Sequence, residues 1–170
     1  MTRTAARALT AARPIIQGLT VLNLLYALGI AALFTTSFFL EDWPMKPLGF
    51  DLATMHPNLP LGIRAIEIIG LIGAAVVHRI LRRLLAIVDS VRGGDPFVLD
   101  NAQRLNAIAW SVLAIEVLRL MVAAISTAVD MQGEMGGFSL APWLAVLLLF
   151  VLAGVFARGA QMRADLEGTV

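Results

Sequence analysis

The stretch LAPWLAVLLLFVLAGVFAR, residues 140–158, decides the fold, because it carries no charged residue before its last position. A helix needs about 20 such residues to cross the hydrocarbon layer of a membrane. Three further apolar stretches, at about residues 15–40, 61–85 and 105–129, are longer still. At 59% hydrophobic residues, a chain of 170 residues could not bury this much apolar surface in a soluble core. The sequence therefore predicts an all-α, four-helix transmembrane bundle, a single integral membrane domain over residues 1–170.

The charged residues around these stretches predict the orientation of the chain. Basic residues gather before the first stretch, between the second and third, and after the fourth, whereas acidic residues dominate the other two connections. Positively charged flanks stay in the cytoplasm, so both termini and the middle connection are predicted inside. The basic residues are Arg3, Arg7, Arg13, Arg79, Arg82, Arg83, Arg92, Arg104, Arg158 and Arg163; the acidic ones are Glu41, Asp42, Asp51, Asp130 and Glu134, with a single Lys46 among them.

The second helix is expected to continue past the membrane as a cytoplasmic extension. Residues 78–91 keep a helical period, with apolar positions on one side and arginines on the other. Gly93 and Gly94 then predict its end. Asp100, with a glutamine three residues later, predicts the N-cap of the third helix, and Pro14 predicts the first position of the first.

Four ionisable residues lie inside the apolar helices and form the candidate intramembrane charge cluster. Arg64 and Glu67 are three apart on the second stretch, and Glu116 and Arg119 are three apart on the third. An unpaired charge at a helix centre costs about 2.5–3.5 kcal/mol on insertion scales, so these side chains should turn inward and pair. Antiparallel packing would bring Glu67 and Arg119 to similar depths, so we expect a cross-helix pair of Glu67 with Arg119, which Arg64 and Glu116 could extend. The cluster either only fixes helix register or forms an element that responds to protons or a ligand.

Several activities are excluded or unsupported by the residues present. The chain has no cysteine, which rules out disulfides and thiolate metal sites. No residue set suits a nucleophile, a base and an oxyanion stabiliser, so an enzyme is not predicted. His56 and His78 are 22 residues apart, about a membrane thickness along a helix, so they cannot both ligate one haem, and no cofactor or metal is predicted. The basic segment from His78 to Arg83 is either a topology signal or a site for anionic lipid head groups or an acidic protein surface.

Two segments carry a resemblance to a known family. They are the loop VRGGDPFVLDNAQRLNAIAW, residues 91–110, and the tail FARGAQMRADLEGTV, residues 156–170. Both resemble the bacterial inner-membrane family known as domain of unknown function 2975, whose members show a G-x-PF…N…RL loop and a tail with an acidic residue before an L-T-V-like close. The matching residues are Gly94, Pro96, Phe97, Asn101, Arg104 and Leu105 in the loop, and Gly159, Asp165, Leu166, Thr169 and Val170 in the tail.

The resemblance implies a four-helix protein of the bacterial inner membrane without an assigned enzymatic activity. Members are often encoded beside a small helix-turn-helix regulator, which implies regulation by binding such a protein. We therefore expect a non-enzymatic regulatory or interaction protein whose loop and tail dock a cytoplasmic partner, with membrane lipids and a second copy as further candidate partners and no direct contact with nucleic acid. Loop and tail could equally pack on each other. The alternative function is a small transporter or membrane sensor that uses Glu67, Glu116 and Arg119.

Overall fold

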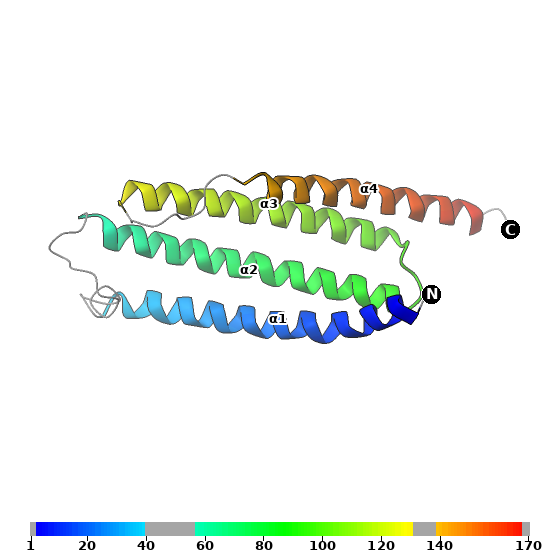
Figure 1. The fold of residues 1–170 in the computed structure, drawn as a ribbon, viewed down its shortest axis with the longest axis horizontal. Helices are drawn as coiled ribbons and strands as arrows, with labels where there is room; N and C mark the ends of the chain where they lie inside the picture. The colour runs from blue at the N-terminus through cyan, green and yellow to red at the C-terminus, as the bar shows by residue number, and fades with distance from the viewer. Residues whose placement is uncertain (1–2, 40–56, 131–138, 168–170) are drawn as a thin grey trace.

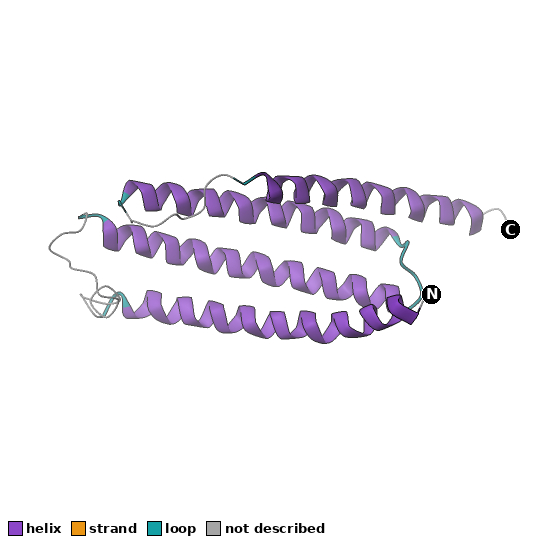
Figure 2. Cartoon of the chain, viewed as in Figure 1, coloured by secondary structure: helices purple, strands orange, loops and turns teal. Residues whose placement is uncertain are grey.

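The computed structural model describes residues 3–39, 57–130 and 139–167, and these form four helices and no strand (Figures 1 and 2). The helices are α1 (Arg3–Thr36), α2 (Leu59–Arg92), α3 (Leu99–Ala128) and α4 (Leu140–Glu167). Each is long and apolar enough to cross a membrane. The predicted all-α, four-helix class is confirmed. His56, Thr169, Val170 and the charged residues of the first and third connections other than Asp130 lie outside the described residues.

The helices lie side by side in chain order and form an open layer. α2 packs between α1 and α3, and α4 packs against α3 (Figure 1). Among the described residues, no Cα atom of α1 comes within 8 Å of α3 or α4, and none of α2 within 8 Å of α4. The outer helices therefore have one helical neighbour each, and large apolar side chains such as Leu22, Leu28 and Leu148 stay exposed, as expected for surfaces that meet lipid.

Close packing within the layer depends on small clusters and small residues. Ile16 of α1 packs with Leu81 and Val88 of α2. Small buried residues, including Ala74, Ala102, Ala109 and Ala153, let the backbones approach one another. Helices in lipid usually associate through small residues, because burying apolar surface against another helix gains little over contact with lipid tails.

The helix ends confirm one expectation and correct two. α2 continues to Arg92 as predicted, and Gly94 adopts a left-handed φ of 92° just beyond it. α3 begins at Leu99, after an extended Val98 whose side chain makes no capping bond, so the expected N-cap at Asp100 is wrong. α1 begins at Arg3, which places Pro14 inside the helix and not at its start.

One end of the layer collects the start of α1, the connection from α2 to α3 and the end of α4 (Figure 1). We call it the Asp95 end and the opposite one the Ser37 end. The arginine-rich segments of the chain gather at the Asp95 end, as four antiparallel helices require. Which side of the membrane this end faces remains a prediction.

Candidate functional site

The connection between α2 and α3, residues 93–98, is held in shape by a buried amide. Asn101 is 0% exposed. Its Nδ2 donates to Ser90 Oγ and to the Pro96 carbonyl, both at 3.0 Å, and its Oδ1 accepts from Arg104 Nη1 at 2.9 Å. Ser90 Oγ in turn donates to the Asp95 carbonyl at 2.8 Å. One side chain therefore joins the end of α2, the connection and the start of α3.

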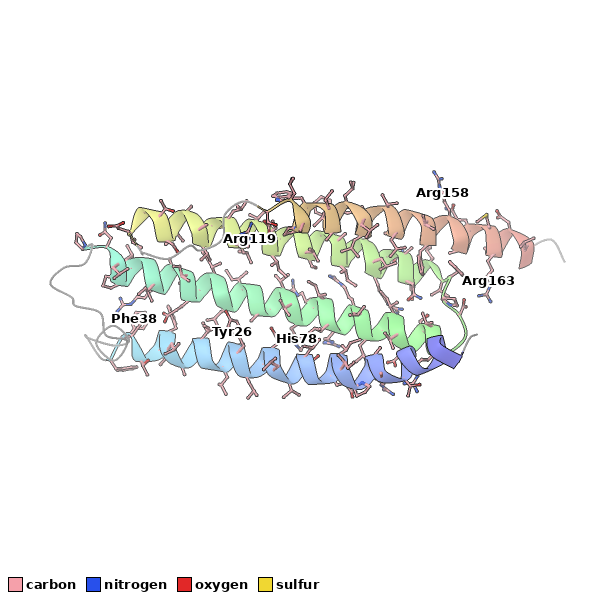
Figure 3. All side chains as sticks on the ribbon, viewed as in Figure 1. Tyr26, Phe38, His78, Arg119, Arg158 and Arg163 are labelled. Carbon is pink, nitrogen blue, oxygen red and sulfur yellow. The ribbon has the colours of Figure 1, made fainter. Side chains whose placement is uncertain are left out.

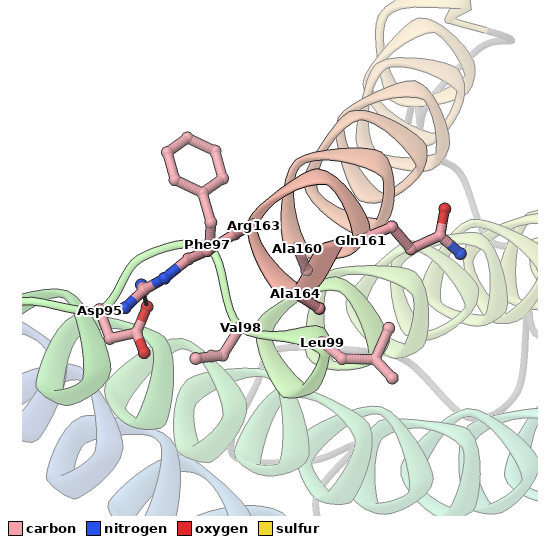
Figure 4. A pocket seen from close by; sticks show the side chains of 8 residues that line it. All are labelled: Asp95, Phe97, Val98, Leu99, Ala160, Gln161, Arg163 and Ala164. Carbon is pink, nitrogen blue, oxygen red and sulfur yellow. Dashed lines mark hydrogen bonds and ion pairs between the residues drawn. The ribbon is translucent and has the colours of Figure 1, made fainter. Parts of the chain in front are cut away.

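The same connection contacts the end of α4. The ring of Phe97 lies so close to Gly159 that a Cβ atom there would be 2.9 Å from Phe97 Cδ1, and its centroid is 5.3 Å from that of Phe156. The Arg163 guanidinium reaches across from α4 to form an ion pair and hydrogen bond with the Asp95 carboxylate (Figure 4). We call this contact the clasp: Asp95 and Phe97 on one side, Phe156, Gly159 and Arg163 on the other.

The clasp brings together the two segments on which the family resemblance was based. A cavity of about 300 Å³ opens beside it. It is lined by Val98 from the connection, Leu99 from α3 and Ala160, Gln161 and Ala164 from α4, as well as by the clasp residues Asp95, Phe97 and Arg163 (Figure 4). Asp165 is exposed on the same stretch of α4. Loop and tail therefore do pack on each other. Nothing in the local spacing foretold the Asp95–Arg163 pair, because its members are 68 residues apart.

The intramembrane charges pair differently from the prediction. Arg119 Nε donates to Glu116 Oε1 and Oε2 at 3.2 and 3.0 Å, and its Nη2 donates to Oε1 at 2.6 Å, so this pair lies within α3. Among the described residues no ion pair joins Glu67 to Arg119, and the expected cross-helix pair is wrong. An ion pair between positions three apart needs no particular helix rotation, and this one already neutralises the guanidinium of Arg119.

Arg64 hydrogen-bonds to Ser37, just beyond the end of α1, and forms no ion pair with Glu67. Its Nη2 donates to the carbonyl of Ser37 at 2.7 Å and its Nε to Ser37 Oγ at 3.3 Å. Its guanidinium also lies 4.5 Å from the ring centre of Phe38, which Figure 3 shows at the end of α1. The last carbonyls of a helix lack partners within the helix, so Arg64 satisfies the end of α1 from α2. The sequence did not indicate this role, because Arg64 and Ser37 are 27 residues apart and no local pattern joins them.

Glu67 is the member of the cluster left without a partner. Its side chain is buried, with the residue 6% exposed, and Oε2 has no hydrogen-bond partner. It lines a cavity of about 380 Å³ between α1, α2 and α3, together with Asn23, Tyr26, Gly73 and Arg119. Asn23 Nδ2 donates to the Ala74 carbonyl of α2 at 3.0 Å. We call this cavity the Glu67 groove.

Two further polar residues within the helices were not singled out as a pair or as a buried site. Arg83 Nη1 donates to the Ala107 carbonyl and to Ser111 Oγ, both at 3.2 Å, and so connects α2 to α3. His78 Nδ1 is buried without a hydrogen-bond partner, and Figure 3 shows the side chain on α2 where that helix faces α1. The sequence had suggested only an interfacial basic segment at these positions.

Four apolar antiparallel helices with charged side chains buried between them define the class: an all-α, multi-pass membrane protein. Residues 4–170 match the family described as "Protein of unknown function (DUF2975)", and the chain belongs to this family. The resemblance drawn from the loop and tail is thereby confirmed over nearly the whole chain. No curated protein and no solved structure matches it.

Proposed function

We propose that the protein is a non-enzymatic membrane protein that acts by docking a cytoplasmic protein on the surface beside the clasp. The observation that carries the proposal is the clasp itself, since it makes one surface out of two segments that are far apart in the chain. Apolar side chains stand exposed there, with Phe97 at 45%, Leu99 at 53% and Leu166 at 73% exposure. Exposed apolar groups around a concave surface are the usual anchor points of a protein partner.

Exposed arginines at the Asp95 end support a partner with an acidic rim. Arg92 is the last residue of α2 and Arg158 lies on α4, and both are exposed. Arginine-rich flanks favour a cytoplasmic position for this end, in a bacterial inner membrane. The family resemblance implies that this partner is a small helix-turn-helix regulator. The regulator would bind through a protein surface, and the nucleic acid that it recognises would not contact this chain.

A pair of matched variants tests the docking function. Leu99→Asp places a charge in the middle of the apolar surface, whereas Gln103→Asp adds the same charge one helical turn further along α3, where the side chain is already exposed. Both are introduced into the full chain in native membranes, and crosslinked partners are identified and rebound as purified proteins. We expect Leu99→Asp to abolish binding and Gln103→Asp to retain it. Equal binding by both variants, or no partner in either, counts against docking.

The Glu67 groove favours a second candidate function, a small transporter or membrane sensor. An ionisable group buried among apolar helices is costly and is associated with ligand and ion pathways. In reconstituted vesicles, Glu67→Gln is expected to remove an ion- or solute-dependent flux or response, while truncation after α4 leaves it intact. A flux that persists in Glu67→Gln would reject this function without affecting the docking proposal.

A further inference from the structure

We propose that the Glu67 groove binds a lipophilic amine, with the amine nitrogen donating to the Glu67 carboxylate and the apolar body lying along α2. The inference rests on the second candidate function and is independent of docking at the clasp. It names the chemical class of ligand that such a transporter or sensor would bind.

The carboxylate of Glu67 lacks the donor that its burial requires. Its Oε2 is enclosed and has no partner. A buried oxygen without a hydrogen bond is unfavourable, and the penalty is larger for a charged group. Neither Arg119 nor Arg64 supplies that hydrogen bond, because Arg119 is bound to Glu116 and Arg64 to Ser37. A donor supplied by a ligand would.

The size and lining of the groove indicate the size and polarity of the rest of the ligand. A volume of about 380 Å³ falls in the lower part of the range typical of small-molecule sites, about 300–1,000 Å³. Isoleucine, valine, leucine, glycine and alanine make up most of the lining. Polar groups come from two helices, Asn23 and Tyr26 from α1 and Arg119 from α3. Figure 3 shows Tyr26 between α1 and α2. An apolar body with one strong donor fits this distribution.

Two glycines of α2, Gly70 and Gly73, leave space in the groove because they have no side chain. A Cβ atom built on Gly73 would meet no atom within 4 Å, and one on Gly70 would lie 3.5 Å from Tyr26 Oη. A Cβ atom at either position would therefore fit without a clash, and a larger side chain at Gly73 would extend into the groove. Gly73 is the better site for a test, since nothing there needs to move.

Other ligand classes fit less well. A hard divalent cation takes about six to eight oxygen ligands, and the lining supplies one carboxylate beside one amide and one phenol. An anion would be repelled by Glu67. A purely apolar molecule, such as a lipid chain, would fill the groove but leave Oε2 without a donor.

The experiment compares two probes that differ at one end. 4-Fluorobenzylamine is protonated at neutral pH and donates hydrogen bonds, whereas 4-fluorobenzyl methyl ether has a similar body and only accepts them. Binding of each to the full chain in lipid nanodiscs is measured by ¹⁹F NMR titration. We expect the amine to bind in a saturable manner and more tightly than the ether by about tenfold or more, as a charge-assisted hydrogen bond implies.

Three variants locate the site. Glu67→Gln should weaken amine binding by about tenfold or more. Gly73→Val should abolish it by filling the groove while leaving Glu67 in place. Gly154→Val on α4 is the matched control, because an added Cβ there also meets nothing within 4 Å and lies outside the groove. It should bind like the wild type.

Three results would overturn the inference. One is equal affinity for the amine and the ether, and a second is unchanged amine binding in Glu67→Gln. The third is amine binding retained in Gly73→Val. If mass photometry also shows a changed subunit number in this variant, a second copy of the chain occupies the groove. Binding is measured without a gradient, so its outcome is separate from that of the flux assay.

Discussion

Replacing Asn101 by alanine should open the connection between α2 and α3 without unfolding the helices. The side chain is fully enclosed and joins Ser90, Pro96 and Arg104 through its amide. Alanine cannot replace any of these bonds. It leaves the Pro96 carbonyl without that donor and removes an acceptor from Arg104.

The size of the effect follows from the two hydrogen bonds that join Asn101 to Ser90 and to Pro96, since the bond to Arg104 lies within α3 and survives opening. An intramolecular bond contributes about 1 kcal/mol net, so the loss of two favours the open connection by about 2 kcal/mol, or about 30-fold in the opening equilibrium. Alanine is also the better helix former by several tenths of a kcal/mol. The free energy of global unfolding should therefore fall less than that of local opening.

Hydrogen exchange of the backbone amides measures the local opening directly. In the wild type, the Gly94 amide donates to the Val91 carbonyl at 3.1 Å and the Asp95 amide to the Ser90 carbonyl at 3.3 Å. Both amides should exchange about 30-fold faster in Asn101→Ala. Asn106→Ala is the matched control, because Asn106 lies on the same helix and is exposed. Similar protection in the two variants would refute the role assigned to Asn101.

Gly62→Ala should lower the thermal unfolding midpoint, because an added Cβ would lie 2.8 Å from Val129 Cγ1. Gly154→Ala should instead stabilise α4 by up to about 1 kcal/mol, because an added Cβ there meets nothing within 4 Å. Circular dichroism melts compare the two variants, and equal midpoints would contradict the packing at Gly62. Exchanging the charges of Asp95 and Arg163 should restore what either single reversal loses, with a coupling of about 1 kcal/mol or less in a double-mutant cycle, because both side chains are nearly half exposed. Alkaline phosphatase fused within the connection from α2 to α3, or after α4, should be inactive, and activity at either site would reverse the predicted orientation.

The fold was largely predictable because the hydrocarbon layer of a membrane permits few backbone structures. A segment within the hydrocarbon layer must satisfy its own backbone, so four long apolar stretches imply four helices whatever their detailed sequence. Gly93 and Gly94 likewise marked the end of α2 correctly, since a left-handed residue is needed there. Asp100 misled because a capping pattern is local: the N-cap is Val98, two residues earlier, and the first turn of α3 includes the buried Asn101, which bonds to Ser90 of α2.

The sequence predicted which residues belong to the candidate sites better than which of them pair with one another. Spacing along one helix placed Glu116 beside Arg119, and depth in the membrane suggested Glu67 as a further partner. Depth does not report the rotation of one helix about another, and it could not show that Arg64 turns to the carbonyl of Ser37. The resemblance located loop and tail residues, but the contact of Phe97 with Gly159 depends on how α4 lies on α3, which no local pattern encodes.

An open layer of helices places unusual weight on contacts at the helix ends. In lipid, apolar surface gains little by burial against another helix, so the outer helices α1 and α4 are not held by the hydrophobic effect. At the Asp95 end, each outer helix forms an ion pair with an acidic residue near the end of α2. Arg13 Nε of α1 lies 3.6 Å from Asp89 Oδ1, and Arg163 of α4 pairs with Asp95. Ion pairs this exposed contribute about 1 kcal/mol at most. They can select one arrangement of the outer helices but cannot enforce it, so a partner bound beside Phe97 would need only modest affinity to shift the end of α4.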